Sequence, residues 1–227
     1  MAEDALDDLR AFFANAEALA ALHVAPIRTY LLHGTPGSGK TSLVHCLAAE
    51  LGLGVAGMSF VPGMTDADVT AAVARVPRGT VLVIEDIDCA FSGRTAQNHG
   101  VTFGAVLGAL DGHAATTDDP LAVFVTTNHL ATLDPALRRR VDYVQEFRPA
   151  TFDQVRRLFD AFFPGAPLAH CEAVWTAGRG AAMSVFQKYL VKARQVGDAT
   201  TRLDVLRALA DCATGAGDTS ARTAMYS

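Results

Sequence analysis

The segment Gly34–Thr41 has the residue types and the spacing of a phosphate-binding loop. It reads Gly-Thr-Pro-Gly-Ser-Gly-Lys-Thr and fits the pattern G-x-x-x-x-G-K-[ST] at every position. Glycines allow backbone N–H groups to face phosphate oxygens, and the start of the following helix adds positive potential. Lys40 would then reach the β- and γ-phosphates, and the Thr41 hydroxyl would ligate Mg²⁺. The predicted nucleotide-binding residues are Gly34, Thr35, Pro36, Gly37, Ser38, Gly39, Lys40, Thr41 and Ser42.

The flanking sequence argues against the alternative, a glycine-rich turn with a solvated lysine. An apolar run, Tyr30–Leu32, precedes the loop, and apolar residues at helical spacing follow it as far as Leu51. A strand, a loop and a helix in this order are the context that the motif requires.

Two acidic residues, Glu85 and Asp86, directly follow the apolar run Thr80–Ile84. In open α/β sheets ligands bind at the C-terminal ends of the strands, which is where these carboxylates would lie. One carboxylate can hold the water shell of Mg²⁺ and the other can polarise an attacking water, two tasks of phosphoryl transfer. A solvated strand end is the alternative for the pair taken alone. We read Asp88 as a turn or helix-cap residue rather than a third ligand.

Asn128 and the arginine run Arg138–Arg140 are two further candidates. Asn128 follows the apolar run Leu121–Val125, where an amide can orient water beside the γ-phosphate. On its own it would be a turn residue. Consecutive arginines at the end of a helix are usually a solvated cap favoured by the helix dipole. The functional alternative is that one or two of them act as arginine fingers on the nucleotide of a neighbouring subunit.

Strand-like and helix-like segments alternate up to Phe147. Continuous β-branched runs such as Thr80–Ile84 predict buried parallel strands, and Tyr143–Phe147 alternates like one more strand. Helical spacing is present in Leu6–Ala16, after the capping signal Thr65–Asp68, and in Val101–Leu110. This order predicts an α/β fold, a P-loop parallel sheet with helices on both faces.

From Pro149 onward the pattern is helical throughout. A small all-helical lid subdomain is therefore predicted at 149–213, after an α/β subdomain at 1–148. The end of the chain, 214–227, carries Gly, Ser and Thr without apolar periodicity and is predicted to be a disordered tail. The four helical segments are Phe152–Phe163, Leu168–Ala177, Met183–Ala193 and Thr200–Ala213.

The composition argues against several classes of function. The net charge is −5, so a generally basic face for nucleic acid is not indicated. No apolar run approaches the roughly 18 residues that cross a bilayer, and the N-terminus is acidic, unlike a targeting peptide. We expect a soluble intracellular chain without a membrane span. The four cysteines lack the spacing of a zinc site and are predicted to be reduced thiols in the core.

Taken together, Gly34–Thr41, Glu85-Asp86, Asn128 and Arg138–Arg140 resemble the Walker A, Walker B, sensor 1 and arginine-finger motifs of AAA ATPases. Longer strings are similar to the subfamily of mitochondrial complex III assembly chaperones (bcs-type) and to related plant AAA proteins. The order Glu-then-Asp is a mark of that subfamily. The strings are Tyr30–Gly34, Ile84–Phe91, Val101–Gly112, Thr126–His129 and Leu133–Leu137, within a similarity that covers about Leu6–Leu209.

The resemblance implies ATP and Mg²⁺ as cofactors and assigns a role to each matching residue. Thr41 and Glu85 would hold the metal, and Asp86 would stand at the water-activating position. Asn128 would be sensor 1, and the fingers would be Arg139 and Arg140. Asp86 is a methylene shorter than Glu, which would change its reach to the water and hence the rate.

The resemblance further implies a homo-oligomeric ring that remodels or translocates a protein client, in a mitochondrial, inner membrane-associated location. The sequence also departs from the family. It shows neither the N-terminal membrane helix nor the substrate-handling domain, so it resembles the ATPase module alone. The segment between Leu137 and Val141 is two residues shorter than the usual arginine-proline-glycine-arginine string. Ser59–Pro62 matches an aromatic pore loop poorly, and Phe60 is predicted to be a core residue.

Three functional hypotheses remain. The first is an ATP-hydrolysing AAA module that acts as a ring. The second is a nucleotide-binding scaffold with negligible hydrolysis, which the shortened arginine segment suggests. The third, a monomeric P-loop phosphotransferase, would need a second substrate pocket and an arginine-bearing lid, for which the sequence offers no candidate.

Overall fold

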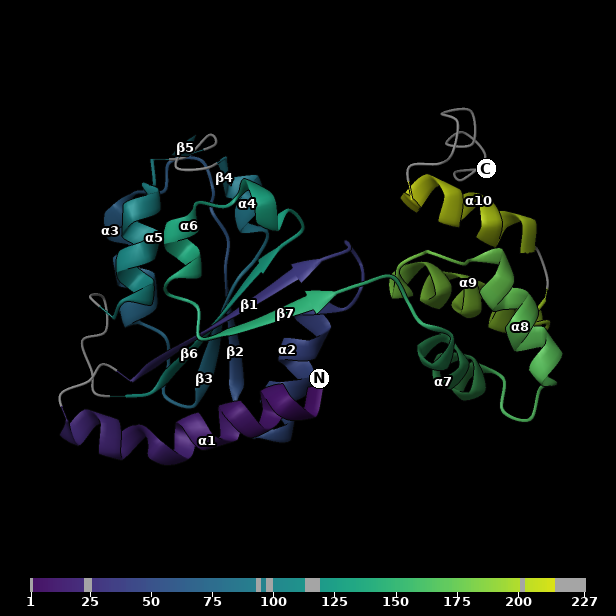
Figure 1. The fold of residues 1–227 in the computed structure, drawn as a ribbon, viewed down its shortest axis with the longest axis horizontal. Helices are drawn as coiled ribbons and strands as arrows, with labels where there is room; N and C mark the ends of the chain where they lie inside the picture. Colours follow the sequence, from purple (N-terminus) through teal and green to yellow (C-terminus); the bar gives the residue numbers. More distant parts are fainter. Residues whose placement is uncertain are drawn as a thin grey trace. The chain divides into compact units, whose positions relative to one another are not determined.

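The computed structural model describes residues 2–22, 26–92, 95–96, 100–112, 119–200 and 203–214. The chain divides into two compact units, one of residues 1–34 and 40–146 and one of residues 35–39 and 147–227. The first unit is built on a sheet and the second is helical (Figure 1). The tail predicted at 214–227 lies, apart from Thr214, outside the described residues.

Five strands form the sheet of the first unit, in the order β2-β3-β6-β1-β7. The pairs β1–β6, β3–β6 and β2–β3 are parallel. The Asp142 N–H donates to Thr29 O, and the Thr35 N–H donates to Phe147 O. From the first bond to the second, residue numbers increase along both strands, so β7 is parallel to β1 as well. The predicted parallel α/β sheet is therefore confirmed. The strands are β1 (Ile27–Gly34), β2 (Gly54–Met58), β3 (Thr80–Ile84), β6 (Leu121–Thr127) and β7 (Tyr143–Phe147).

Helices cover both faces of this sheet (Figure 1). Successive strand residues point to opposite faces, and neighbouring Tyr30 and Leu31 illustrate this. The Tyr30 ring stacks on Phe124 and its hydroxyl reaches Asp8 of α1 (Ala2–Ala21), which also contacts α2 (Lys40–Glu50). Leu31 belongs to the core cluster that α3 (Asp66–Ala74) and α5 (Phe103–Leu110) complete on the other face.

Side-chain caps mark where α3 and α5, the helices on this second face of the sheet, begin. Thr65 and Asp68 form a capping box at the start of α3, and Thr102 caps α5 by accepting from Ala105 N–H. The Asp66 carboxylate accepts from both the backbone and the hydroxyl of Thr102 and so links the two helices. The remaining elements of this unit are α4 (Ile87–Ala90), β4 (Phe91–Ser92), β5 (Thr95–Ala96), η1 (Leu130–Thr132) and α6 (Pro135–Arg138).

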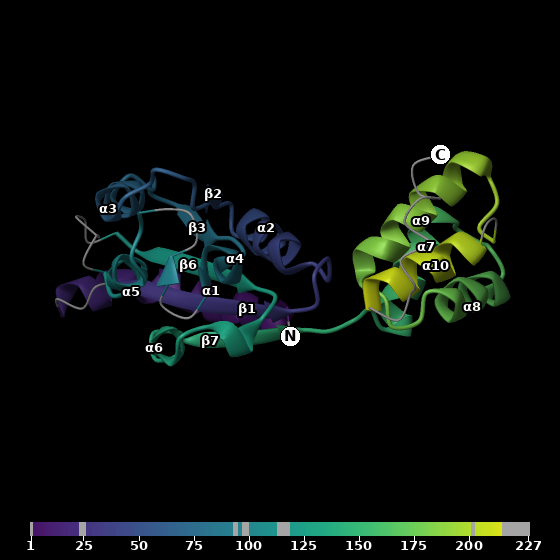
Figure 2. The same cartoon turned by 90° about the horizontal axis from the view of Figure 1, so that it is seen from above.

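The second unit has its own apolar core, built from helices that contact one another in several pairs (Figure 2). Phe159, Phe186 and Leu190 are fully buried within it. The first of these helices starts at a capping box between Thr151 and Gln154. The helices are α7 (Phe152–Phe162), α8 (Leu168–Ala177), α9 (Met183–Val196) and α10 (Leu203–Thr214).

The structure corrects one sequence-based prediction about the cysteines and supports another about Phe60. Cys171 is buried, and burial raises the pKa of its thiol, but Cys46 and Cys89 are exposed rather than core residues. Both exposed cysteines lie on helices whose buried positions are taken by other residues, Val44, Leu47 and Ala48 in α2 and Ile87 and Ala90 in α4. Phe60 is half-buried and packs edge-on against Phe91, as expected of a residue at the core boundary. Within the described residues, no helix is long and apolar enough to cross a membrane.

Candidate active site

The phosphate-binding loop joins β1 to α2 through backbone conformations that favour glycine. Gly37 and Gly39 have φ values of 72° and 103°. At Gly37 a Cβ atom would also overlap the Ser184 hydroxyl, and the Ser184 N–H donates to Gly37 O at 3.0 Å. The Ser38 hydroxyl closes the turn by donating to Thr35 O at 2.6 Å. Glycine is thus favoured at position 37 chiefly for its backbone angle, and any Cβ atom there would also displace the Ser184 hydroxyl.

Lys40 is the first residue of α2, and its side chain turns inward. The residue is only 7% exposed. Its Nζ donates to Gly34 O at 2.9 Å and to Asn128 Oδ1 at 2.7 Å. Burial lowers the pKa of the amine, while the nearby carboxylates of Asp86 and Asp88 act in the opposite direction. A cation is therefore held at the C-terminal edge of the sheet, where a phosphate would enter.

Thr41 and Glu85 bring two side-chain oxygens together from different elements. The Thr41 hydroxyl at the start of α2 donates to Glu85 Oε1, just after β3, at 3.0 Å. Magnesium prefers oxygen ligands and retains several waters, so it needs only one or two protein side chains beside a phosphate. The described residues contain no group of three or more His, Cys, Asp or Glu suited to a metal. The Thr41–Glu85 pair therefore fits a Mg²⁺ ion held by two protein side chains, a phosphate and several waters.

Asp86 has a left-handed backbone, with φ 46° and ψ 52°. Among the residues with a described placement it is the one non-glycine residue with positive φ. Its N–H donates to the Thr126 hydroxyl at 3.0 Å, and its Oδ1 accepts from Asn128 Nδ2 at 3.2 Å. Such backbone outliers persist where the surroundings over-determine them, and they cluster at functional sites.

Asn128 connects the cation to the carboxylate. Its amide accepts from Lys40 through Oδ1 and donates to Asp86 through Nδ2. These three residues follow β1, β3 and β6, which are neighbours in the parallel sheet. The structure therefore brings the sequence-predicted Lys40, Asp86 and Asn128 into one hydrogen-bonded chain, with Thr41 and Glu85 beside it.

The three arginines are placed differently from one another. Arg138 and Arg139 are exposed at the end of α6. Arg140 is half-buried: its Nε donates to Asp111 at 2.7 Å and its Nη1 to Ala136 O at 3.1 Å. The hydrogen bond to Asp111 raises the pKa of Arg140.

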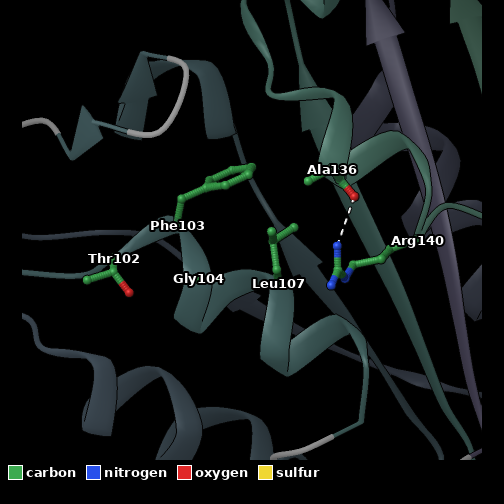
Figure 3. A pocket seen from close by; sticks show the side chains of 6 residues that line it. All are labelled: Thr102, Phe103, Gly104, Leu107, Ala136 and Arg140. Carbon is green, nitrogen blue, oxygen red and sulfur yellow. Dashed lines mark hydrogen bonds between the residues drawn. The ribbon is translucent and has the colours of Figure 1, made fainter.

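Arg140 also lines a cavity of about 420 Å³ between α5 and α6. Figure 3 shows its guanidinium turned toward the Ala136 carbonyl, with Phe103 and Leu107 on the facing helix. The hydrogen bonds of Arg140 thus lie within its own subunit, outside the chain formed by Lys40, Asn128 and Asp86.

The sequence reasoning missed several residues that support the site. Thr126 and Asp88 hold the backbones of Asp86 and Asn128, and Asp111 holds Arg140. Their positions could have indicated them, because Thr126 and Asp88 each lie two residues from a predicted site residue. The local sequence does not indicate which groups they bond to.

Comparison with known families bears directly on this site. The model of the family described as "ATPase family associated with various cellular activities (AAA)" matches residues 30–149. The chain belongs to the AAA family. The matched range contains the whole segment from the loop to the arginines, Gly34–Arg140, whose geometry is described above.

The curated relatives agree with the resemblance seen in the sequence. The chain is 38% identical over 169 residues to the probable mitochondrial chaperone bcs1 of Schizosaccharomyces pombe, covering 71% of this chain and 37% of that protein. It is 33% identical over 185 residues to mitochondrial chaperone BCS1 of Danio rerio, covering 76% and 44%. The predicted similarity to a BCS1-type AAA ATPase module is confirmed. The chain spans about two fifths of the length of these relatives.

Solved structures support the AAA fold. The Thermotoga maritima RuvB Holliday junction branch migration motor has a TM-score of 0.60 at 20% identity, covering 87% of this chain and 65% of that chain. A chain of the E. coli MS115-1 HORMA:CdnC:Trip13 complex has a TM-score of 0.64 at 21% identity, covering 92% and 87%. At these identities the likeness concerns the fold alone.

Proposed function

We propose that this AAA module binds ATP with Mg²⁺ and hydrolyses it to ADP and phosphate. The observation that carries the proposal is the hydrogen-bonded chain from Lys40 through Asn128 to Asp86, next to the Thr41–Glu85 pair. It combines a cation, a water-orienting amide, a carboxylate and metal-ligand oxygens at one sheet edge. Phosphoryl transfer needs these groups, because its catalysis is mostly positioning and charge stabilisation.

The roles of the individual residues follow from this geometry. The loop N–H groups and the Lys40 amine would bind the β- and γ-phosphates, and Thr41 with Glu85 would hold Mg²⁺, which neutralises phosphate charge when bound. Asn128 would orient a water in line with the bond to be broken. Asp86 would accept a proton from that water as its oxygen bonds to the γ-phosphorus. The bond from the γ-phosphorus to the bridging oxygen then breaks, and ADP leaves with the electron pair.

The proposed assembly is a homo-oligomeric ring in which Arg139 and Arg140 act on the nucleotide of the next subunit. The exposure of Arg139 at the end of α6 supports its part in this assignment. By similarity to proteins named mitochondrial chaperone BCS1, the ring would remodel or translocate a protein client. The names of these relatives support a mitochondrial location. The resemblance of the sequence to complex III assembly chaperones extends the proposal to an inner membrane-associated location and a part in assembling respiratory complexes.

The second candidate is a nucleotide-binding scaffold with negligible hydrolysis. Two observations favour it: the shortened segment between Leu137 and Val141, and the engagement of Arg140 inside its own subunit. If Arg140 stays bound to Asp111 in the assembly, the neighbouring site lacks one cation.

A direct test measures phosphate release from ATP and Mg²⁺ at increasing protein concentration. Hydrolysis by a ring should rise more steeply than the concentration until assembly is complete, because each site gains a neighbour. Lys40→Ala should abolish the signal and weaken nucleotide binding, whereas Lys188→Ala, on the surface of α9, should change neither. ATP that stays intact in an assembly of confirmed mass would favour the scaffold.

A further inference from the structure

Two side chains outside the predicted catalytic set form crossed hydrogen bonds between the segments that follow β3 and β6. The Thr126 hydroxyl at the end of β6 accepts from Asp86 N–H at 3.0 Å. In the other direction, Asp88 Oδ1 accepts from Asn128 N–H at 3.2 Å. Each strand end thus supplies an acceptor to the backbone of the other. We call the four residues Asp86, Asp88, Thr126 and Asn128 the clasp.

Thr126 is placed to hold the Asp86 backbone in its left-handed conformation. The residue is 2% exposed, so its hydroxyl has little access to water and its bond to Asp86 N–H is sheltered. Asp86 adopts φ 46° without being glycine, and a conformation of this kind needs support from its surroundings. Without the Thr126 acceptor, the Asp86 N–H would be left unsatisfied in this conformation.

The Asp88 carboxylate does not cap its own helix, α4. The N-cap residue of α4 is Asp86, which makes no side-chain capping bond, and α4 is only four residues long. The Asp88 carboxylate instead reaches across to the segment after β6 and fixes the backbone of the residue whose amide joins Lys40 to Asp86. This differs from the turn or helix-cap role expected from the sequence.

We propose that Asp88 and Thr126 are positioning residues that keep the Asn128 amide and the Asp86 carboxylate in register for ATP hydrolysis. The inference rests on the proposed function. It also bears on the short acidic residue at position 86: the crossed bonds fix its backbone, and from that backbone the short side chain brings its carboxylate to Asn128 Nδ2 at 3.2 Å. Neither residue is expected to touch nucleotide or metal, since each bonds to a backbone N–H; the Asp88 charge also opposes the lowering of the Lys40 pKa by burial, and Asp88→Asn removes that charge while keeping the acceptor.

The test compares variants that remove an acceptor with variants that keep it. Asp88→Ala and Thr126→Val remove the acceptors, whereas Asp88→Asn and Thr126→Ser retain an oxygen in the same place. Each acceptor loss should lower kcat about tenfold or more, because small displacements of reacting groups are costly. The affinity for a fluorescent ATP analogue should stay within about twofold, since phosphate binding depends on the loop. The two conservative variants should recover most of kcat.

Asp66→Ala is the matched control, because Asp66 also accepts a backbone N–H across two elements, from Thr102, but lies away from the clasp. It should change thermal stability and leave kcat unchanged. The proposal is overturned if Asp88→Ala and Thr126→Val keep kcat within twofold of the wild type. It is equally overturned if Asp66→Ala lowers kcat as much as they do.

A second measurement separates this inference from the proposed function. Backbone amide exchange, followed in peptides containing Asp86 and Asn128, reports the clasp without any hydrolysis. Asp88→Ala should speed exchange at Asn128, and Thr126→Val at Asp86, with no change in Asp66→Ala. A wild type that binds but never hydrolyses ATP would refute the proposed function alone. The exchange rates would then still test whether Asp88 and Thr126 hold the backbones of Asn128 and Asp86. Unchanged exchange in both variants would refute the clasp even in an active enzyme.

Discussion

At the scale of single residues, Asp86 is the strained position of the site. A non-glycine residue with a left-handed backbone costs about 1–3 kcal/mol, which the surrounding hydrogen bonds must offset. Its carboxylate meets Asn128 Nδ2 at 3.2 Å from this fixed backbone. The direction of the side chain is therefore set by its backbone, and a longer carboxylate would extend past the amide that it now meets.

This geometry predicts that lengthening the side chain does not improve the enzyme. Asp86→Asn removes the proton acceptor and should lower kcat by about 10²–10⁴-fold. Asp86→Glu keeps the acceptor but displaces it, so kcat should fall about tenfold. Steady-state ATP turnover with saturating Mg²⁺ measures both, and binding of an ATP analogue should be nearly unchanged. A kcat for Asp86→Glu equal to that of the wild type would show that the backbone does not set the reach.

The sequence predicted the chemical residues of the site better than their supports. The positions of Lys40, Glu85 and Asn128 at one sheet edge were predictable, because Lys40 completes a motif, Glu85 directly follows an apolar run and Asn128 comes three residues after the end of another. Thr126 and Asp88 were not, because their partners lie 40 residues away along the chain and are backbone N–H groups of no particular residue type.

At the scale of elements, the long strands and helices were predictable and the short ones were not. The strand Thr80–Ile84 was predicted with the bounds that β3 has, because a continuous β-branched run leaves little choice. The four-residue helix α4 and the two-residue strands β4 and β5 span only about one period of the helical or strand pattern, so no repeat can show in the sequence. The sequence thus predicted the layers of the sheet unit but not the turn that carries Asp86 and Asp88.

The first helix, α1, is joined to β1 by a partly buried polar cluster. The Asp8 carboxylate accepts from Arg28 at 2.6 and 3.1 Å and from the Tyr30 hydroxyl at 2.7 Å. Arg28 also lies 3.7 Å from Asp142, just before β7. Burial raises the pKa of Tyr30, so the hydroxyl remains a donor to Asp8.

We predict that Asp8→Ala destabilises the sheet unit and that Asp7→Ala does not. Removing Asp8 leaves Arg28 and Tyr30 without this acceptor, which should cost about 1–3 kcal/mol. At about 2–4 °C per kcal/mol for a chain of this size, the thermal midpoint should fall by several degrees. Asp7 is 76% exposed in its pair with Arg10, so its loss should be close to neutral. Thermal unfolding followed by circular dichroism compares the two, and equal midpoints would contradict the role of Asp8.

The same cluster predicts a pH dependence of stability. Burial opposes ionisation of Asp8, but hydrogen bonds from Arg28 and Tyr30 outweigh it and lower its pKa below 3.8. A carboxyl with a lowered folded pKa stabilises the protein above its unfolded pKa and loses that contribution as pH falls through the folded value. The difference in unfolding free energy between the wild type and Asp8→Ala should be constant near neutral pH and shrink below about pH 4. Urea titrations at stepped pH measure it, and a difference independent of pH would refute the coupling.

At the scale of the whole molecule, the proposed role of the arginines determines whether one copy of the chain would be a complete enzyme. Arg140 is bound to Asp111 and Ala136, and Arg139 is exposed. A cation that completes the site from a neighbouring subunit would make hydrolysis a property of the assembly. An arginine finger is worth about 10³–10⁵ in turnover, so its origin can be detected by mixing variants.

We predict that two inactive variants restore activity when they are mixed. Lys40→Ala loses its own site but keeps its arginines, while the double variant Arg139→Ala/Arg140→Ala keeps its site and loses the fingers. In an equal mixture about a quarter of the interfaces pair an intact site with intact arginines, so about a quarter of wild-type turnover should return. Arg156→Ala/Arg157→Ala, on the exposed face of α7, is the matched control and should remain active alone.

Mass measurement with a slowly hydrolysed ATP analogue must show that the two variants are present in the same assemblies. Full activity of the Arg139→Ala/Arg140→Ala protein, or no recovery in assemblies that have mixed, would show that the arginines do not act in trans.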